Sequence, residues 1–367
     1  MNDTRITTSM MRCKNTCARM CRYAYRDGLR PNEKPHYFRT GDAHHLGMEL
    51  NGLGVDIPTI IETICDYYED EIRKRPASDA LDLKYEQARV VIAIACYIRY
   101  WKHDEDNFEI VNTELPFELP IINPETGRSS PTHTMAGKID KVIRIFGHYG
   151  VGMAIMEHKT TICDIDINSP YIRKLRIDTQ ITNYVIAANE LLEGPCAGVL
   201  YDITRKPQQK PKTVLERDKD GHVKIYDESG ERVWTDRDGG RWITGSNHAK
   251  GWRSRKRQET PSEYGERIRI AIQENPAKYF QRYFIARIED DIVEARQDMW
   301  QTKDALASAD KMNAWPRNDL ACLAHGQCAY FDICTEGGWE PGNAVPDGFH
   351  ITDDIHQELN VDRVLEG

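Results

Sequence analysis

The clearest alternation of apolar and polar residues lies between Met135 and Tyr184. Apolar side chains alternate with polar ones from Lys138 to Phe146 and again from Val151 to Thr161, which predicts two β-strands. The segment G-H-Y-G between them is typical of a turn, so we expect a hairpin. Asp178 is a good N-cap for an amphipathic helix that continues to about Leu192.

Helical spacing of apolar residues dominates on both sides of this hairpin. The expected helices are 9–27, one opening at Gly41, 58–74, 77–102, 261–281 and 285–312. Further strands are expected at 107–121 and 199–203, with a loop at 123–131. The Gly-rich, acidic segment after residue 334 is expected to be an appendage.

Three charged residues fall on the predicted hairpin. Glu157 and Lys159 are separated by one residue, so their side chains point to the same face of a strand, and Asp140 lies one strand away. Two neighbouring carboxylates repel each other unless a cation lies between them, and a hard divalent metal ion is the usual solution. Lys159 would then orient a water molecule or stabilise charge on a phosphate. The alternative is a surface hairpin that carries three unrelated charges.

Composition indicates a soluble globular protein. Hydrophobic residues make up 40% of the 367 residues and charged residues 29%. The chain has no apolar run of the length that spans a membrane, and its first residues lack the apolar stretch of a secretion signal. We therefore expect a cytoplasmic protein without a membrane partner.

Charge is distributed unevenly along the chain. The net charge of −9 argues against nucleic acid, but residues 206–257 carry 14 Lys and Arg against 8 Asp and Glu. This stretch is rich in turn residues and is predicted to be an insertion. Its basic run suits a phosphate backbone, and an aromatic ring in it suits a base, although a solvated loop is an equal alternative. The candidate DNA-binding residues here are Trp252, Arg253, Arg255, Lys256 and Arg257.

Ten cysteines without a secretion signal are unlikely to form disulfides. Four are expected to be small core residues: Cys65, Cys96, Cys163 and Cys196. The other six form one group near each end of the chain: Cys13, Cys17 and Cys21, then Cys322, Cys328 and Cys334. Such grouping suggests a metal centre that ties the two ends together.

Four short motifs occur in one order along the predicted helix, strand, strand and helix. They are Gly41 with His45, Gly137-Lys-Ile-Asp140, Glu157-His-Lys159 and Gln180-x-x-x-Tyr184. Together they resemble the GxxxH, GxxD, (D/E)xK and QxxxY motifs of the RecB-like branch of the PD-(D/E)xK nucleases. Taken alone, His45 would be a partly buried helix histidine.

The cysteines resemble those of the iron–sulfur members of that branch, which include CRISPR-associated RecB-like exonucleases, AddB-type nucleases and phage-encoded relatives. The resemblance implies a 4Fe-4S cluster, with ligands Cys17, Cys322, Cys328 and Cys334. Cys21 is the alternative to Cys17. The C-terminal spacing departs from the C-x-x-C of several relatives, which leaves His325 as a substitute ligand and zinc as the alternative metal.

The resemblance covers about residues 9–334 and implies an α/β fold. Its core would be restriction-endonuclease-like, a mixed sheet flanked by helices, with N- and C-terminal helical parts joined by the cluster. It implies one nuclease domain, divided into a helical part (about 9–105), a catalytic core (about 106–204), the insertion (about 205–260) and C-terminal helices (about 261–334), followed by the tail at 335–367.

The resemblance also implies a chemistry. One or two Mg²⁺ or Mn²⁺ ions would be held by His45, Asp140, Glu157 and the backbone carbonyl of His158. Lys159 would act on the water or the phosphate, and Gln180 and Tyr184 would hold the DNA strand. The implied function is a metal-dependent deoxyribonuclease that acts as an exonuclease on single-stranded DNA or free ends. The phage-encoded relatives suggest a phage origin, and a helicase or recombinase is a candidate partner.

Two interpretations from other classes stay open. A catalytically idle module would use the same fold to grip DNA or a helicase, although it has no chemical need for Asp140, Glu157 and Lys159 together. A zinc-dependent DNA-binding protein would hold zinc through its cysteines. Metal analysis separates the second from an iron–sulfur nuclease.

Overall fold

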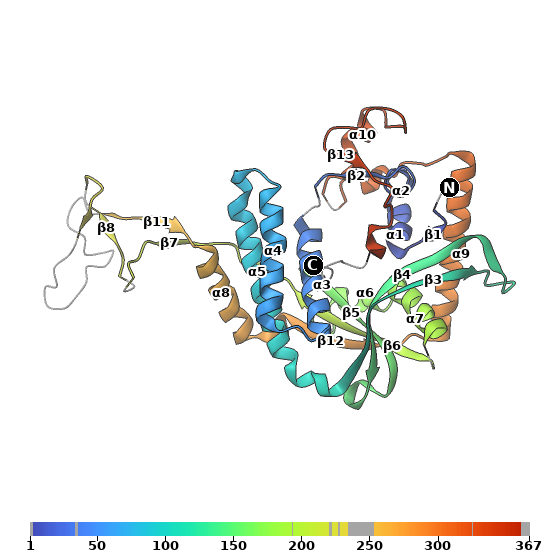
Figure 1. Ribbon diagram of the computed structural model, residues 1–367, viewed down its shortest axis with the longest axis horizontal. Coiled ribbons are helices and arrows are strands. Elements are labelled where there is room, and N and C mark those ends of the chain that lie inside the picture. Colours follow the sequence, from blue (N-terminus) through green and yellow to red (C-terminus); the bar gives the residue numbers. More distant parts are fainter. Residues whose placement is uncertain are drawn as a thin grey trace.

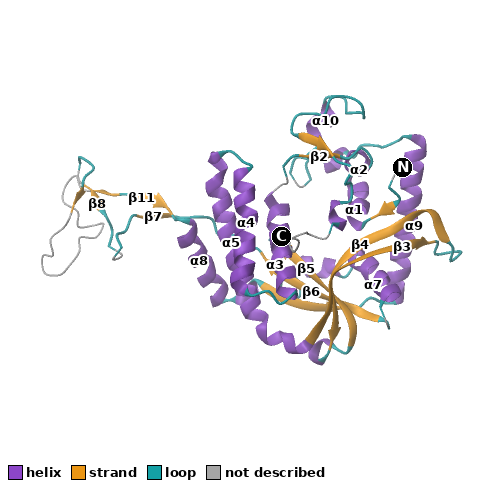
Figure 2. Cartoon of the chain, in the orientation of Figure 1, coloured by secondary structure: helices purple, strands orange, loops and turns teal. Residues whose placement is uncertain are grey.

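The computed structural model describes residues 3–33, 36–192, 194–219, 222–226, 228–233, 253–324 and 326–360. Within these residues, a six-stranded mixed sheet lies at the centre and helices cover it on both sides (Figures 1 and 2). The strand order is β1-β4-β5-β6-β12, and β3 also pairs with β4. The strands are β1 (Arg5–Ile6), β3 (Phe108–Ile122), β4 (Ser129–Ile145), β5 (Gly152–Thr161), β6 (Cys196–Arg205) and β12 (Phe280–Ile285). The α/β class that the sequence implies is confirmed.

The helices fall into two groups with separate apolar cores. One group packs together beside the sheet: α3 (His36–Gly52), α4 (Ile57–Arg73), α5 (Ala80–Trp101) and α8 (Pro261–Glu274). The other shares a core with the opposite side: α1 (Thr8–Thr16), α2 (Ala18–Tyr25), α6 (Pro170–Leu175), α7 (Thr179–Leu191) and α9 (Glu289–Met312). None of the described helices has the length and apolarity to cross a membrane.

The hairpin at the centre of the sequence pattern is confirmed. β4 and β5 are antiparallel, and a short turn that contains Gly147 and Gly150, both at positive φ, joins them. Glycine suits these positions because it lacks the Cβ that makes positive φ unfavourable. The predicted N-cap is also confirmed, since the Asp178 side chain accepts a hydrogen bond from the Gln180 N–H at the start of α7.

The single helix expected at 9–27 is interrupted at Cys17. This residue is extended, with φ of −159° and ψ of 118°, and it separates α1 from α2. Its N–H still donates to the Cys13 carbonyl, which closes the last turn of α1. The break therefore divides the expected helix into two shorter ones.

The prediction of one helix at 261–281 is wrong for the residues after Glu274. Asn275 and Pro276 end α8, and Phe280–Ile285 forms β12, which pairs antiparallel with β6. Proline removes a backbone donor and ends the helix, whereas the strand depends on hydrogen bonds to a segment about 80 residues earlier in the chain. The same dependence explains why β1 and the full length of β6 were not expected.

The segment after residue 334 is not an appendage. β13 (Phe349–Ile351) pairs antiparallel with β2 (Leu29–Pro31), next to the short helix α10 (Phe331–Thr335). Trp339 and His356 are buried, and Arg22 pairs with Glu340. The acidic tail therefore completes the packing of the N-terminal segment.

The described residues of the basic insertion form an arm that projects away from the sheet at the left of Figure 1. Its described strands are β7 (Thr213–Leu215), β8 (Ile225–Tyr226), β9 (Arg232–Val233), β10 (Arg253–Ser254) and β11 (Lys256–Gln258). β7 pairs with β11, and β8 pairs with β9 and β10. This arrangement is consistent with the insertion that the sequence predicts.

Candidate active site

A row of three carboxylates crosses three neighbouring strands. β4 and β5 pair Lys141 with Met156, so the next residues, Asp140 and Glu157, lie opposite each other. On the other side of β4, the flanking pairs of β3 place Glu114 opposite Asp140. Residues directly opposite in antiparallel strands have their Cβ atoms about 5 Å apart on one face. The sheet thus brings these acids together from positions 43 residues apart.

Asp140 receives contacts from two other elements. The His158 N–H donates to Asp140 Oδ2 at 3.0 Å, and His45 Nδ1 lies 3.6 Å from the same oxygen. His45 reaches this point because α3 buries Ala43 and Leu46 against the neighbouring helices. The His45 side chain remains 42% exposed, so it can still turn toward a ligand.

Glu157 and Lys159 share a face of β5, as the sequence predicts, and they are in contact. Lys159 Nζ donates to Glu157 Oε1 at 2.6 Å and to Gln180 Oε1 at 3.3 Å. Gln180 Nε2 in turn donates to the Tyr184 hydroxyl at 3.1 Å, which confirms that these residues of α7 lie one turn apart on one face. Asp178 adds a second negative charge, with Oδ2 3.8 Å from Lys159 Nζ.

Asp140 and Glu157 are largely buried, and the neighbouring cations do not fully compensate their negative charge. It raises the pKa of Asp140 to about 6, and the nearby Glu114 charge adds to the effect. Burial and the Asp140 charge raise the pKa of Glu157 to about 7. For Lys159, burial opposes the charge, but Glu157 and Asp178 raise its pKa. The ammonium group is therefore stable, whereas the carboxylates favour a proton or a cation.

The residues fit a hard divalent cation. Glu157 is only 2% exposed, and its Oε2 has no hydrogen-bond partner among the described residues. Carboxylate oxygens of this kind are preferred ligands of Mg²⁺ and Mn²⁺. In the described part of the chain, no three His, Cys, Asp or Glu side chains converge on one point as a metal site requires. A cation would therefore need a rotation of side chains such as His45.

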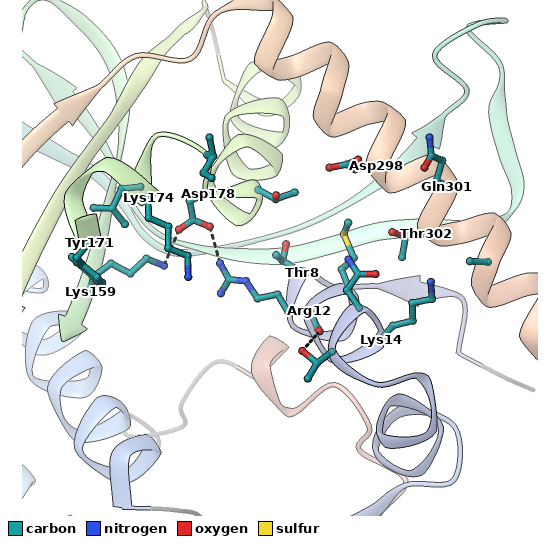
Figure 3. A pocket seen from close by; sticks show the side chains of 17 residues that line it. Thr8, Arg12, Lys14, Lys159, Tyr171, Lys174, Asp178, Asp298, Gln301 and Thr302 are labelled. Atoms are coloured by element: carbon teal, nitrogen blue, oxygen red, sulfur yellow. Dashed lines mark hydrogen bonds and ion pairs between the residues drawn. The ribbon is translucent and has the colours of Figure 1, made fainter. Parts of the chain in front are cut away.

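A groove opens from the site along α1. It has a volume of about 960 Å³ and runs between α1, α6, the start of α7 and α9 (Figure 3). Four cationic side chains line it: Arg12, Lys14, Lys159 and Lys174. Arg12 donates to Asp178 Oδ1 at 2.7 Å, so Asp178 lies between Arg12 and Lys159. The groove thus joins the N-terminal helix to the lysine of the site.

The opposite face of the same strands carries a second, fully buried polar layer. Asp202 Oδ2 on β6 lies 3.1 Å from His158 Nδ1 and 3.2 Å from Arg282, and it accepts a hydrogen bond from Tyr97. Although burial alone would raise the pKa of Asp202, Arg282 and His158 hold it well below its ordinary value. His158 and Asp202 have side chains that are at most 3% exposed. This layer stabilises the scaffold beneath the site.

The cysteines of the two ends approach each other through Cys17. Arg19 N–H donates to the Pro316 carbonyl at 3.1 Å, and Asn318 Nδ2 donates to the Thr16 carbonyl at 2.8 Å. Burial raises the pKa of both Cys328 and Cys334, and the Cys17 charge adds to the effect in each.

Cys21 has different surroundings, because it is fully buried against Met10 and Cys13. The Cys328 N–H donates to the Cys322 carbonyl at 2.8 Å. Cys17 thus interacts with Cys328 and Cys334 through charge, but no three of these cysteines converge on one point in the described part of the chain. His325 lies outside the described residues. The prediction that Cys163 is a small core residue is wrong, because this residue is exposed.

The basic residues of the arm are not part of the groove lining. Arg257 pairs with Glu263 at 2.6 Å, and Arg255 stacks over Tyr226 at 3.9 Å. Arg253 and Lys256 are exposed, and Trp252 lies outside the described residues. The structure therefore separates these candidates from the strand that carries Lys159.

Sequence reasoning missed Glu114, Lys138 and Arg12, and it treated Asp178 only as a helix cap. Lys138 Nζ lies 2.5 Å from Glu114 Oε2. The only local signal was that Lys138 and Asp140 are two residues apart on one strand, which places them on one face. Glu114 on β3 becomes a neighbour of Lys138, and Arg12 on α1 a neighbour of Asp178, only through the fold.

A comparison with protein-family models matches residues 5–335 to the PD-(D/E)XK nuclease superfamily. No curated protein matches the sequence. The matched region includes the sheet, both helical groups and every motif described above. This match, over nearly the whole chain, shows that the protein belongs to the PD-(D/E)XK nuclease superfamily, whose members are metal-dependent hydrolases that cleave DNA.

Proposed function

We propose that the protein is a Mg²⁺- or Mn²⁺-dependent deoxyribonuclease that degrades DNA from an end, with single-stranded DNA as its preferred substrate. The observation that carries this proposal is the buried pair Asp140 and Glu157 with Lys159 Nζ 2.6 Å from Glu157. Membership of the superfamily supports a nuclease in general. The choice of cation, strand and polarity is our extension.

The residues divide the chemistry between them. His45, Asp140, Glu157 and the His158 carbonyl would hold the cation, which supplies a water of lowered pKa and offsets charge on the phosphate. Lys159 holds its proton, because Glu157 and Asp178 favour the ammonium form, so it donates to the phosphate or orients the water. Gln180 accepts from Lys159 and donates to Tyr184, which fixes the rotamers of all three.

The groove supports the choice of substrate. Its cationic side chains can contact phosphates without reading bases, so binding would be insensitive to sequence and sensitive to salt. Arg12 and Lys174 approach Lys159 from two elements (Figure 3). A strand that followed the groove would reach Lys159 from the side of α1. The exposed Arg253 and Lys256 of the arm would contact DNA outside the groove.

The test is cleavage of end-labelled single- and double-stranded DNA with Mg²⁺, Mn²⁺ or EDTA. Lys159→Ala should lose at least about a hundredfold in rate, because donors of this kind contribute 10²–10³. Lys84→Ala is the matched control, since Lys84 is an exposed lysine of α5. The product ladder gives the polarity. DNA that stays intact with wild type and variant, yet is retained by both, would favour an idle binding module.

We also propose that Cys17, Cys322, Cys328 and Cys334 hold a 4Fe-4S cluster that clamps α1 and α2 to the C-terminal segment. Thiolates are the usual ligands of such clusters, and zinc is the alternative metal. The contacts of Arg19 with Pro316 and of Asn318 with Thr16 support the clamp.

Iron and acid-labile sulfide should be measured in anaerobically purified protein. Cys17→Ser should lose iron, whereas Cys21→Ser should retain it, because Cys21 faces Met10 and Cys13. Zinc without sulfide in the wild type would contradict the cluster. Loss of iron in Cys21→Ser, with iron retained in Cys17→Ser, would show that Cys21 is the ligand instead of Cys17.

A further inference from the structure

Glu114 belongs to none of the four motifs, yet it lies in the row of acids. It sits on β3 opposite Asp140, and its side chain is 13% exposed. Its φ of 51° is uncommon for a residue with a side chain. Its charge acts on Asp140 and on His45, so it is close to the other candidate ligands.

Lys138 holds the Glu114 carboxylate. Its Nζ lies 2.5 Å from Glu114 Oε2, and it also donates to the Asn360 carbonyl at 3.0 Å. Lys138 and Asp140 point to the same face of β4, because they are two residues apart. The lysine is therefore close enough to compete with a cation for Glu114.

The balance of charge on this face leaves room for one more cation. Three carboxylates (Glu114, Asp140 and Glu157) face two ammonium groups (Lys138 and Lys159). Independently of this count, Glu157 Oε2 is buried and has no hydrogen-bond partner among the described residues. A buried carboxylate oxygen without a partner is unfavourable unless a ligand meets it.

We propose that Glu114 is a further cation-binding carboxylate of this site and that Lys138 regulates the affinity by competing with the cation for Glu114. The inference rests on the proposed function, because the cation is the one that Asp140 and Glu157 would bind. Release from Lys138 lets the Glu114 carboxylate turn toward the cation or toward a water bound to it. Because Lys138 competes for Glu114, the strength of this ion pair sets the cation concentration that is needed to occupy the site.

The test is the dissociation constant of Mn²⁺ for the full chain without DNA, measured from the electron paramagnetic resonance signal of free Mn²⁺. Glu114→Gln should weaken binding by about ten- to hundredfold, as loss of a supporting ligand does. Lys138→Gln should tighten binding, which a merely structural salt bridge would not do. In the double variant, the effect of Lys138→Gln should disappear.

Glu118→Gln is the matched control, because Glu118 lies on the same strand and its carboxylate accepts from Thr134 rather than from Lys138. It should bind Mn²⁺ as the wild type does. Glu114→Gly repeats the test with a residue suited to positive φ, in case Glu114→Gln fails to fold.

The outcomes separate the inference from the proposed function. Unchanged Mn²⁺ binding in both Glu114 variants, with binding lost in Asp140→Asn, overturns the role of Glu114 and leaves the nuclease proposal intact. Weaker binding in Lys138→Gln overturns the competition. A wild type that binds no Mn²⁺ overturns both proposals.

Discussion

Strands β4, β5 and β6 present charged side chains on both faces of the sheet, and successive residues of one strand have opposite surroundings. On one face, Asp140 and Glu157 have raised pKa values of about 6 and 7. On the other, Arg282 and His158 hold the pKa of Asp202 well below its ordinary value. Both faces are buried, so burial does not explain why the pKa values differ. They differ because cations compensate the charge of Asp202 and do not fully compensate the charges of Asp140 and Glu157.

The difference separates a scaffold from a site. The Asp202 layer brings a guanidinium, a phenol and an imidazole to one carboxylate, so its charge is balanced by the protein itself. The Asp140 face is left with a surplus of negative charge that a ligand can balance. Successive side chains of a strand point to opposite faces of the sheet, so one strand can contribute to both the scaffold and the site.

The largest expected effect is on the compensated face. Asp202→Ala should lower the free energy of unfolding by about 3–5 kcal/mol, because it leaves Arg282 and His158 buried without this partner. Urea denaturation measures the change. Glu109→Ala removes an exposed pair with Arg144 and should change the free energy by about 1 kcal/mol or less. Equal losses in the two variants would contradict a distinct buried layer.

On the face that carries Asp140 and Glu157, removal of a carboxylate is expected to raise the free energy of unfolding rather than lower it. Asp140→Asn should abolish cleavage yet raise the free energy of unfolding at pH 8 by about 3 kcal/mol, since burial raises the pKa of Asp140 from 3.8 to about 6 and a shift of one pKa unit corresponds to about 1.4 kcal/mol. With its folded pKa raised to about 6, Asp140 binds more protons folded than unfolded between about pH 4 and 6. The stability of the wild type therefore falls as pH rises through this window.

The gain in Asp140→Asn should accordingly be complete above about pH 6 and absent below about pH 4. Thermal unfolding in EDTA across this range measures it, because the chelator removes cations that would stabilise the wild type. A variant less stable than the wild type at pH 8 would show that the acid is compensated within the protein.

A smaller effect is expected from backbone strain at the row of acids. Glu114→Gly should be more stable than Glu114→Ala by about 1 kcal/mol, because both variants lose the pair with Lys138 and only alanine keeps the positive φ that is unfavourable for a residue with a side chain. Asn313→Gly is the matched control at a φ of 46°, and asparagine tolerates this region, so only a few tenths of a kcal/mol are expected. Chemical denaturation of these variants and the wild type compares the two gains.

The smallest effect is expected outside both faces, on the arm. Arg257 pairs with Glu263 and lowers its pKa to about 2, but Glu263 is 46% exposed. Arg257→Ala should therefore leave the free energy of unfolding nearly unchanged, because water screens the pair. Salt titration of the melting temperature checks this. A loss near that of Asp202→Ala would show that the arm is structurally coupled to the core.

The sequence alone determined the local geometry of the site. Alternation along a strand put Glu157 and Lys159 on one face, and helical spacing put Gln180 one turn from Tyr184. Asp178 at a helix start was likewise readable. These relations span two to four residues, and the backbone period fixes them whatever the rest of the chain does.

Only the tertiary structure decided which distant residues meet. The register of β3 on β4 put Glu114 beside Asp140, the extended backbone at Cys17 divided one expected helix into two, and β12 formed because β6 offered it a partner. Each of these segments has local patterns compatible with several partners or with a helix. The choice depends on burial and hydrogen bonds between residues far apart in the chain, which local periodicity does not encode.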